Sequence, residues 1–202
     1  QNNFQELPPG FDASINPRPS YDVNSGTPLK LLYVGGLEPT VYDISQLIKV
    51  ISRRDDVQMT ICCRLDEWEL YRHLYKPYMS ENIQVVHVSS GELTCYYHNA
   101  DVFLMAMSHT EYMDFAMPLK LFEAIGYSVP IVSMNYREVA RKIRSADIGW
   151  VVQEFDELDN LLAQVTSNRL LLAEKHEHLL NCRVENTWDS RATAAGEYLL
   201  QK

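Results

Sequence analysis

The sequence predicts an α/β fold with a doubly wound, parallel, six-stranded sheet of the Rossmann type, followed by extra C-terminal helices. Short apolar runs alternate with amphipathic helical stretches along most of the 202 residues. Within the runs the apolar residues are largely consecutive, which is typical of strands that helices cover on both faces. After Val165 the chain carries two more helical patterns and no further strand pattern.

The predicted elements follow one another in a regular order. The pattern changes abruptly at Leu29, where the first strand is expected to begin, and Gly35-Gly36 closes it. Asp43 precedes apolar residues at helical spacing, so we expect it to cap the first helix. The strands are expected at 29–34, 57–62, 83–88, 101–107, 130–133 and 149–152. The helices are expected at 44–51, 68–74, 91–99, 119–127, 137–145 and 157–165, then at about 168–181 and 186–200.

Residues 1–28 differ from the rest of the chain in composition. They hold five of the nine prolines and show no clear hydrophobic periodicity. Proline-rich segments of this kind form turns and extended stretches. We therefore expect a linker or extended lead-in over 1–28 that is not a packed element, and one domain over 29–202 that includes the C-terminal helices.

The charge of the chain limits its partners. The formal net charge is −9, and lysine and arginine form no block anywhere. Nucleic acids and anionic membrane surfaces are bound through clustered cations, so both are excluded as partners of this chain. A small anion remains possible, because one or two cations and a helix N-terminus can hold a diphosphate.

The four cysteines indicate a reducing environment. None of Cys62, Cys63, Cys95 and Cys182 has zinc-type spacing to a partner. We expect buried free thiols and a cytoplasmic location. No metal site is expected.

Ligands of open parallel sheets bind beyond the carboxyl ends of the strands. This rule selects the loops that begin at Gly35, Arg64, Val88, Ser108 and Met134. The loop from Ser108 is the longest and the most polar of the five. It leads directly into a predicted helix that contains Pro118, Lys120 and Glu123.

The start of that helix is the strongest candidate site. Pro118 has the fixed φ and the missing N–H that suit a first helical position. Lys120 then lies in the first turn, beside unpaired amides and the positive end of the helix dipole, where a cation is poorly placed unless it faces an anion. Glu123 follows on the same helical face and can accept hydrogen bonds from vicinal hydroxyls. The residue pattern is equally compatible with an ordinary surface Lys–Glu pair.

Two other loops leave alternatives open. Gly35-Gly36 allows either close approach of the backbone to a ligand or a tight turn. The pair is not part of a GxGxxG motif, so the dinucleotide fingerprint is missing. Arg64 directly follows the second strand and is either a phosphate ligand or a solvated surface residue.

The segment 117–132 carries a specific resemblance. It reads Met-Pro-Leu-Lys-Leu-Phe-Glu-Ala-Ile-Gly-Tyr-Ser-Val-Pro-Ile-Val. It resembles the donor-site signature of GT-B retaining glycosyltransferases, family 4 and its relatives, in which P-x-K-x-x-E heads a helix and a G-x-P-V-I stretch follows. Residues 7–12, 32–37, 82–88, 99–102 and 146–149 also resemble segments of the family. The resemblance covers nearly the whole chain, but only the donor-binding C-terminal half of such an enzyme.

The resemblance implies a role for each site residue. Lys120 contacts the phosphates of a nucleoside-diphosphate sugar and stabilises the leaving group, which makes it the catalytic residue, and Glu123 contacts the ribose. Backbone near Val88 and Ser89 meets the base, and Gly35-Gly36 faces the interdomain cleft. Pro118, Leu121 and Arg64 complete the predicted substrate-binding set. Transfer of a hexosyl group proceeds without a metal, and no cofactor is needed besides the sugar donor.

The sequence also departs from the family pattern. Many members have a glutamate eight positions before the helix glutamate, where this chain has Phe115. The common Arg/Lys pair after the glycines is missing, since 37–41 contains no cation. These departures leave the sugar open and make Arg64 a candidate for the second cation.

The resemblance further implies partners that lie outside this chain. An N-terminal acceptor-binding domain is expected, together with any membrane contact, and the chain alone is expected to be inactive. The expected process is polysaccharide or glycoconjugate assembly. The alternatives are a nucleotide-sugar epimerase or phosphorylase of the same plan, and a non-catalytic interaction domain of this fold.

Overall fold

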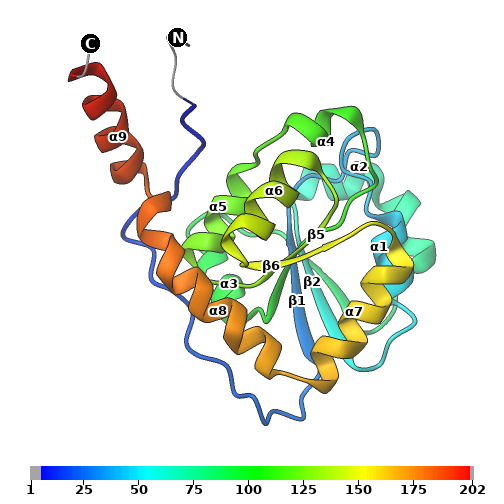
Figure 1. Cartoon of the computed structure of the whole chain (residues 1–202). Coiled ribbons are helices and arrows are strands. Elements are labelled where there is room, and N and C mark those ends of the chain that lie inside the picture. The colour runs from blue at the N-terminus through cyan, green and yellow to red at the C-terminus, as the bar shows by residue number, and fades with distance from the viewer. Residues whose placement is uncertain (1–5, 201–202) are drawn as a thin grey trace.

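The computed structural model describes residues 6–200 and has a six-stranded, all-parallel sheet in the order β3-β2-β1-β4-β5-β6 (Figure 1). β1, β2 and β3 lie side by side toward one edge of the sheet. β4 lies on the other side of β1, and β5 and β6 continue from it to the opposite edge. The doubly wound α/β fold predicted from the alternation of apolar runs and helices is therefore confirmed. The strands are β1 (Leu29–Val34), β2 (Val57–Cys62), β3 (Ile83–Val86), β4 (Val102–Met105), β5 (Ile131–Met134) and β6 (Gly149–Val152).

Two strands are shorter than their apolar runs predict. The β2–β3 ladder ends at the pair Cys62 and Val86. β4 leaves its ladder at Met105, although Ala106 and Met107 remain buried. An apolar run shows that residues are buried, not that they pair with a neighbouring strand. The ends of these two runs lie beyond the paired residues, where Val88 and Met107 line a cleft at the carboxyl ends of the strands.

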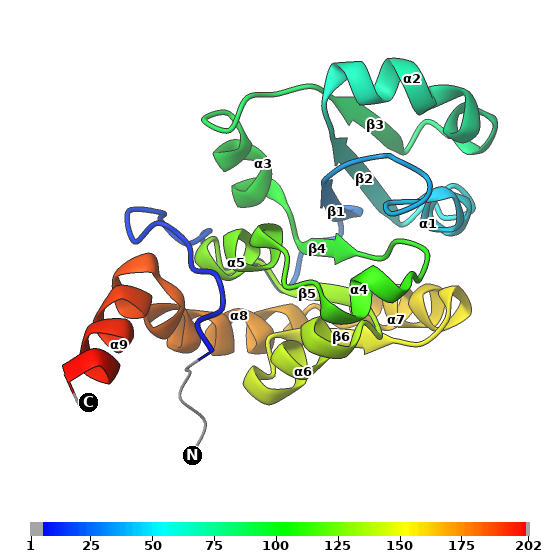
Figure 2. The same cartoon turned by 90° about the horizontal axis from the view of Figure 1, so that it is seen from above.

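Nine helices are found in the part of the chain that the structure describes, and the last two form the predicted C-terminal extension. They are α1 (Ser45–Ile51), α2 (Leu65–Tyr75), α3 (Leu93–Asn99), α4 (Glu111–Phe115), α5 (Leu119–Gly126), α6 (Arg137–Ala146), α7 (Phe155–Ser167), α8 (Leu170–Cys182) and α9 (Trp188–Leu200). α1 contacts α7 on one face of the sheet, while α3 and α5 lie on the other (Figure 2). The sequence did not predict α4, which lies inside the long loop after β4.

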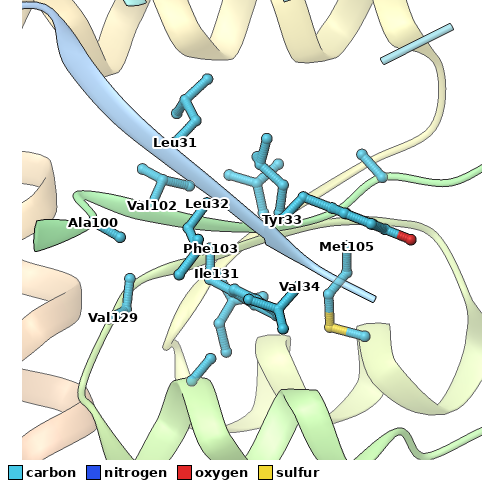
Figure 3. Close-up of a cluster of buried hydrophobic side chains, with 14 of the residues drawn as sticks. Leu31, Leu32, Tyr33, Val34, Ala100, Val102, Phe103, Met105, Val129 and Ile131 are labelled. Atoms are coloured by element: carbon cyan, nitrogen blue, oxygen red, sulfur yellow. The ribbon is translucent and has the colours of Figure 1, made fainter. Parts of the chain in front are cut away.

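The core is centred on β1, β4 and β5. Every residue of β1 except Lys30 is buried, because neighbouring strands flank it and helices cover both faces. Figure 3 shows Leu31 and Leu32 among side chains of β4 and β5, with Tyr33 placing its hydroxyl at the margin of the cluster. Gly149 starts β6 where a Cβ atom would lie 1.9 Å from the carbonyl oxygen of Ile131, so no side chain fits there.

The predicted starts of α1 and α5 each shift by one residue. The N-cap residue of α1 is Ile44, but Asp43 still accepts a 2.8 Å hydrogen bond from the Ser45 amide. Asp43 also accepts a 3.0 Å bond from the Ser108 hydroxyl, which ties α1 to the loop after β4. Pro118 is the N-cap residue of α5 and not its first helical residue, with an extended ψ of 142°.

The lead-in packs against the domain, which corrects the expectation of an unpacked segment. Phe11 is buried and forms an isolated bridge with Thr187. Arg18 lies 3.5 Å above the Tyr21 ring and 3.7 Å from the Asp101 carboxylate. The contacts with Thr187 and Asp101 join residues far apart in sequence, which periodicity does not reveal. Residues 1–5 of the predicted lead-in, and residues 201 and 202, lie outside the described residues.

The C-terminal helices differ in how they pack. α8 crosses the amino ends of the strands, where His176 donates to the Ser128 carbonyl at 2.8 Å and Arg169 donates to Thr27 at 2.7 Å. α9 has no buried residue and projects from the domain beside the lead-in (Figures 1 and 2). None of the helices between residues 6 and 200 has both the length and the apolar content needed to cross a bilayer.

Candidate functional site

A cleft of about 600 Å³ opens at the carboxyl edge of the sheet. Loops after β1, β2, β3 and β4 and the start of α5 contribute to its wall, so four of the five predicted loops meet there. The wall is mostly apolar and aromatic, and its charged residues are Arg64, Glu67 and Lys120. Its size is within the range of small-molecule sites in proteins.

Lys120 and Glu123 form the central polar pair at this cleft. The Lys120 ammonium donates to both Glu123 carboxylate oxygens, at 2.7 and 2.8 Å. The side chains are 35% and 29% exposed, so each remains reachable from solvent. The hydroxyl of Tyr97 donates a third hydrogen bond to Oε2 of Glu123 at 3.0 Å. Lys120 lines the cleft directly, and its ammonium connects the cleft to the carboxylate.

The backbone at the start of α5 adds to this positive region. Pro118 has no N–H, and no side chain caps the helix. The first amides of a helix, here those of Leu119 and Lys120, have no acceptor within it and carry the positive end of its dipole. Cleft, amides and ammonium together form a site suited to a diphosphate or a similar anion.

The Gly35-Gly36 loop is held in place by three side chains. The hydroxyls of Tyr33 and Tyr75 donate to the carbonyls of Gly36 and Leu37, at 2.7 and 2.8 Å. The Leu37 amide donates to Oε2 of Glu67 at 2.8 Å. No glycine among the described residues has a positive φ. A Cβ on Gly36 would lie 2.9 Å from the Tyr42 ring, so close packing explains the glycine better than turn conformation does.

Arg64 lines the cleft but is already paired. Its guanidinium bonds closely to Glu67 and lies 3.8 Å from Asp66. The Arg64 side chain is 74% exposed, whereas that of Glu67 is 16% exposed. Glu67 therefore neutralises the cation that sequence reasoning offered as a second phosphate ligand, and Arg64 must exchange this partner to meet an anion.

Three other predicted residues occupy different positions. Val88 lines the cleft, as do Ser90 and Leu93. Ser89 instead donates its amide and hydroxyl to the Glu92 carboxylate, at 2.9 and 2.7 Å. Leu121 is fully buried in the core, so its side chain supports α5 from behind.

The loop after β4 forms the lip of the cleft. Phe115 is 70% exposed at the end of α4, with the Arg137 guanidinium 5.7 Å from its ring centre. Asp114 accepts hydrogen bonds from the His109 ring and the Arg137 amide, and these bonds lower the pKa of the Asp114 carboxyl. Asp114, the carboxylate next to Phe115, therefore stabilises the loop through these hydrogen bonds.

The cleft also contains residues that sequence reasoning missed. They are Tyr42, Glu67, Tyr112, Met105 and Met107 in the wall, and Tyr97 behind Glu123. The long polar loop from Ser108 indicated that residues near Tyr112 could lie at a ligand site. The sequence of α3, in contrast, carries no pattern that distinguishes Tyr97 from a core residue.

The cysteines and the metal-ligating side chains do not form a second site. The cysteines are free, with Cys62 and Cys63 buried as expected, whereas Cys95 is exposed and Cys182 partly buried. In residues 6–200, the group of ligand-type side chains close enough to share a metal is Asp147, Glu174 and His178. The ammonium of Lys175 already bonds to both of its carboxylates, at 2.8 and 3.2 Å. Asp147 precedes β6, whereas Glu174 and His178 lie on α8, so the group is at the amino ends of the strands and away from the cleft.

Comparison with known families gives one match over most of the chain. The family described as "Glycosyl transferases group 1" matches residues 21–181. This span includes β1 to β6, the cleft and α5. No curated protein sequence matches the chain.

Solved structures support the same fold. WaaG, a glycosyltransferase involved in lipopolysaccharide biosynthesis, superposes with a TM-score of 0.71 at 18% identity over 95% of this chain and 55% of its own. HepE from Anabaena, in complex with UDP and glucose, gives 0.75 at 12% identity over 96% and 56%. Sucrose-phosphate synthase from Thermosynechococcus elongatus gives 0.69 at 17% identity over 96% and 51%. The chain spans about half the length of these proteins and matches the C-terminal half of the GT-B fold.

Proposed function

Because this chain belongs to the glycosyl transferases group 1 family, we propose that its cleft binds the nucleoside-diphosphate sugar of a sugar-transfer reaction. The observation that carries the proposal is the Lys120–Glu123 pair at the start of α5, in which Lys120 lines the cleft and bonds to the carboxylate of Glu123 one turn further along the helix. A cation beside free helix amides suits the diphosphate, and a carboxylate one turn away suits the ribose diol. HepE has been solved with UDP, and so has a variant of TarM from S. aureus, another protein of similar fold (TM-score 0.68 at 14% identity), which makes UDP the first nucleotide to test.

The proposed chemistry is transfer of a hexosyl group to an acceptor glycan or glycoconjugate. The bond between the anomeric carbon and the β-phosphate oxygen breaks, a bond to an acceptor hydroxyl oxygen forms, and the hydroxyl proton passes to solvent. The nucleoside diphosphate departs with the bonding electrons. Lys120 and the α5 amides stabilise the negative charge that develops on it, the role that a divalent metal has in other transferases.

The acceptor is proposed to bind to a second domain. α9 carries no buried residue, exposes Trp188, Leu199 and Leu200, and projects beside the lead-in, so both ends of the described chain extend from the same side of the domain (Figure 1). We propose that an N-terminal acceptor-binding domain meets this side, makes any membrane contact, and is needed for turnover. The free cysteines favour a cytoplasmic location, and polysaccharide or glycoconjugate assembly is the proposed process.

Calorimetric titration of the 202-residue chain tests the proposal. UDP, GDP and ADP are titrated separately, and thermal unfolding with each nucleotide gives a second readout that does not depend on the heat of binding. We expect saturable binding of at least one of the three and a matching rise in Tm. A chain that is folded by circular dichroism, yet shows neither heat nor stabilisation with any of them, would refute the proposed function.

A further inference from the structure

Besides Lys120, the Glu123 carboxylate has a hydrogen-bond partner in the interior of the domain. Tyr97 lies on α3, is completely buried, and donates its hydroxyl to Oε2 of Glu123 at 3.0 Å. The residue on α3 one turn earlier, Leu93, lines the cleft. One short helix therefore contributes both to the cleft wall and to the support of the carboxylate.

The Tyr97 ring is fixed on several sides. It stacks on Tyr127 with a centroid distance of 4.4 Å and an interplanar angle of 9°, and packs against Phe103 at 5.7 Å. Burial and the adjacent Glu123 carboxylate raise the pKa of Tyr97 well above its ordinary range, so its phenol remains a donor. A fixed ring with a permanent donor holds its acceptor in one orientation.

Lys120 is the more mobile of the two donors to Glu123. Its ammonium is on a flexible stem, is partly exposed, and occupies both carboxylate oxygens. Each carboxylate oxygen can accept more than one hydrogen bond, but the ammonium lies against both oxygens and so competes with a ribose diol for Glu123. A diphosphate in the cleft would draw the ammonium toward itself and so release the carboxylate.

We propose that Tyr97 is a positioning residue, which keeps the Glu123 carboxylate oriented for the ribose when Lys120 turns from Glu123 to the diphosphate. This inference rests on the proposed function of the cleft and assigns different roles to Lys120 and Tyr97. Lys120 exchanges one partner for another, whereas Tyr97 keeps its hydrogen bond in both states. Tyr97 thus contributes to recognition of the ribose and not of the phosphates.

The test compares Tyr97→Phe with Tyr127→Phe. Tyr127 belongs to the same aromatic stack, and its hydroxyl bonds to Thr94 at 2.8 Å instead of to Glu123. Both variants lose one hydroxyl from the same region, so their Tm values control for general damage. Affinities are measured for the nucleoside diphosphate that binds the unmodified chain most tightly, for its 2′,3′-dideoxy form, and for pyrophosphate.

We expect the unmodified chain to prefer the ribose form over the dideoxy form by about tenfold or more, since hydroxyls bonded to a carboxylate are involved. Tyr97→Phe should reduce this preference by at least about threefold and leave pyrophosphate affinity unchanged. Tyr127→Phe should keep the full preference. Equal losses for all three ligands, or an unchanged preference in Tyr97→Phe, would overturn the inference while leaving the proposed function standing. Failure of all nucleotides to bind the unmodified chain would instead refute the proposed function.

Discussion

Replacement of Lys120 by alanine should separate ligand binding from folding. The Lys120–Glu123 pair is an i,i+3 contact between partly exposed side chains, and such pairs stabilise a helix by only about 0.2–0.5 kcal/mol. Alanine is also a good helix former. We therefore expect Lys120→Ala to change the free energy of unfolding by less than about 0.5 kcal/mol.

The effect on diphosphate affinity should be much larger. A hydrogen bond to a charged group contributes about 1.5–3 kcal/mol, which corresponds to a loss of about 10- to 150-fold in affinity. The bound ammonium is also released from Glu123, which offsets part of the gain, so the lower half of this range is the better expectation. Calorimetry with the tightest nucleoside diphosphate gives the affinity, and urea unfolding gives the stability.

A lysine at the opposite edge of the sheet provides the control. Lys30 lies near the start of β1 and lines a separate hollow, away from the cleft. Lys30→Ala removes the same charge and should leave nucleotide affinity within about twofold of the unmodified chain, because charges beyond a Debye length are screened. Unchanged affinity in Lys120→Ala would refute the phosphate role of Lys120. Equal losses in the two variants would assign the effect to net charge alone.

Two further predictions concern the stability of the fold. Gly149→Ala should lower the free energy of unfolding by about 3 kcal/mol, because the new Cβ would lie 1.9 Å from the Ile131 carbonyl oxygen. Gly26→Ala, where a Cβ meets nothing within 4 Å, is its control, and equal urea midpoints for the two variants would contradict the prediction. Burial, assisted by Arg18, lowers the pKa of His176 from 6.5, so the unfolded chain binds more protons and stability contributed by neutral His176 is lost as the pH falls below 6.5. The free energy of unfolding of His176→Gln should therefore fall less between pH 7.5 and 5.5 than that of the unmodified chain. Equal decreases would show that groups other than His176 determine the loss of stability at low pH.

Much of the fold could be predicted from local patterns. The consecutive apolar residues of β1 and β2 gave those strands their observed bounds, because a strand between two layers of helices is buried on both faces. The start of α5, just before Lys120, could be located because Pro118 and the polar loop before it mark a helix boundary. The resemblance of 117–132 to the family's donor-site signature then favoured a binding role for this helix, which spacing alone left undecided.

Other features could not be predicted because they join residues that are distant in sequence. The contact of Tyr97 with Glu123 spans 26 positions, and that of Phe11 with Asn186 spans most of the chain. Arg64 and Glu67 are only three positions apart, a spacing that allows a local pair, but the sequence does not show that Glu67 also reaches the Leu37 amide beside the Gly35-Gly36 loop. Local patterns record only whether a residue is buried or at the end of an element.

The sequence by itself determined the order of strands and helices along the chain, the edge of the sheet where the cleft lies, and the helix start that contains Lys120 and Glu123. Hydrophobic periodicity and backbone restrictions act over a few residues, so the chain carries this information locally. Only the tertiary structure decided which groups are free to meet a ligand. It placed Glu67 between Arg64 and the loop at Leu37, and it placed Lys120 between Glu123 and the cleft. It also fixed Glu123 from behind through Tyr97, because side-chain pairing depends on how distant segments pack.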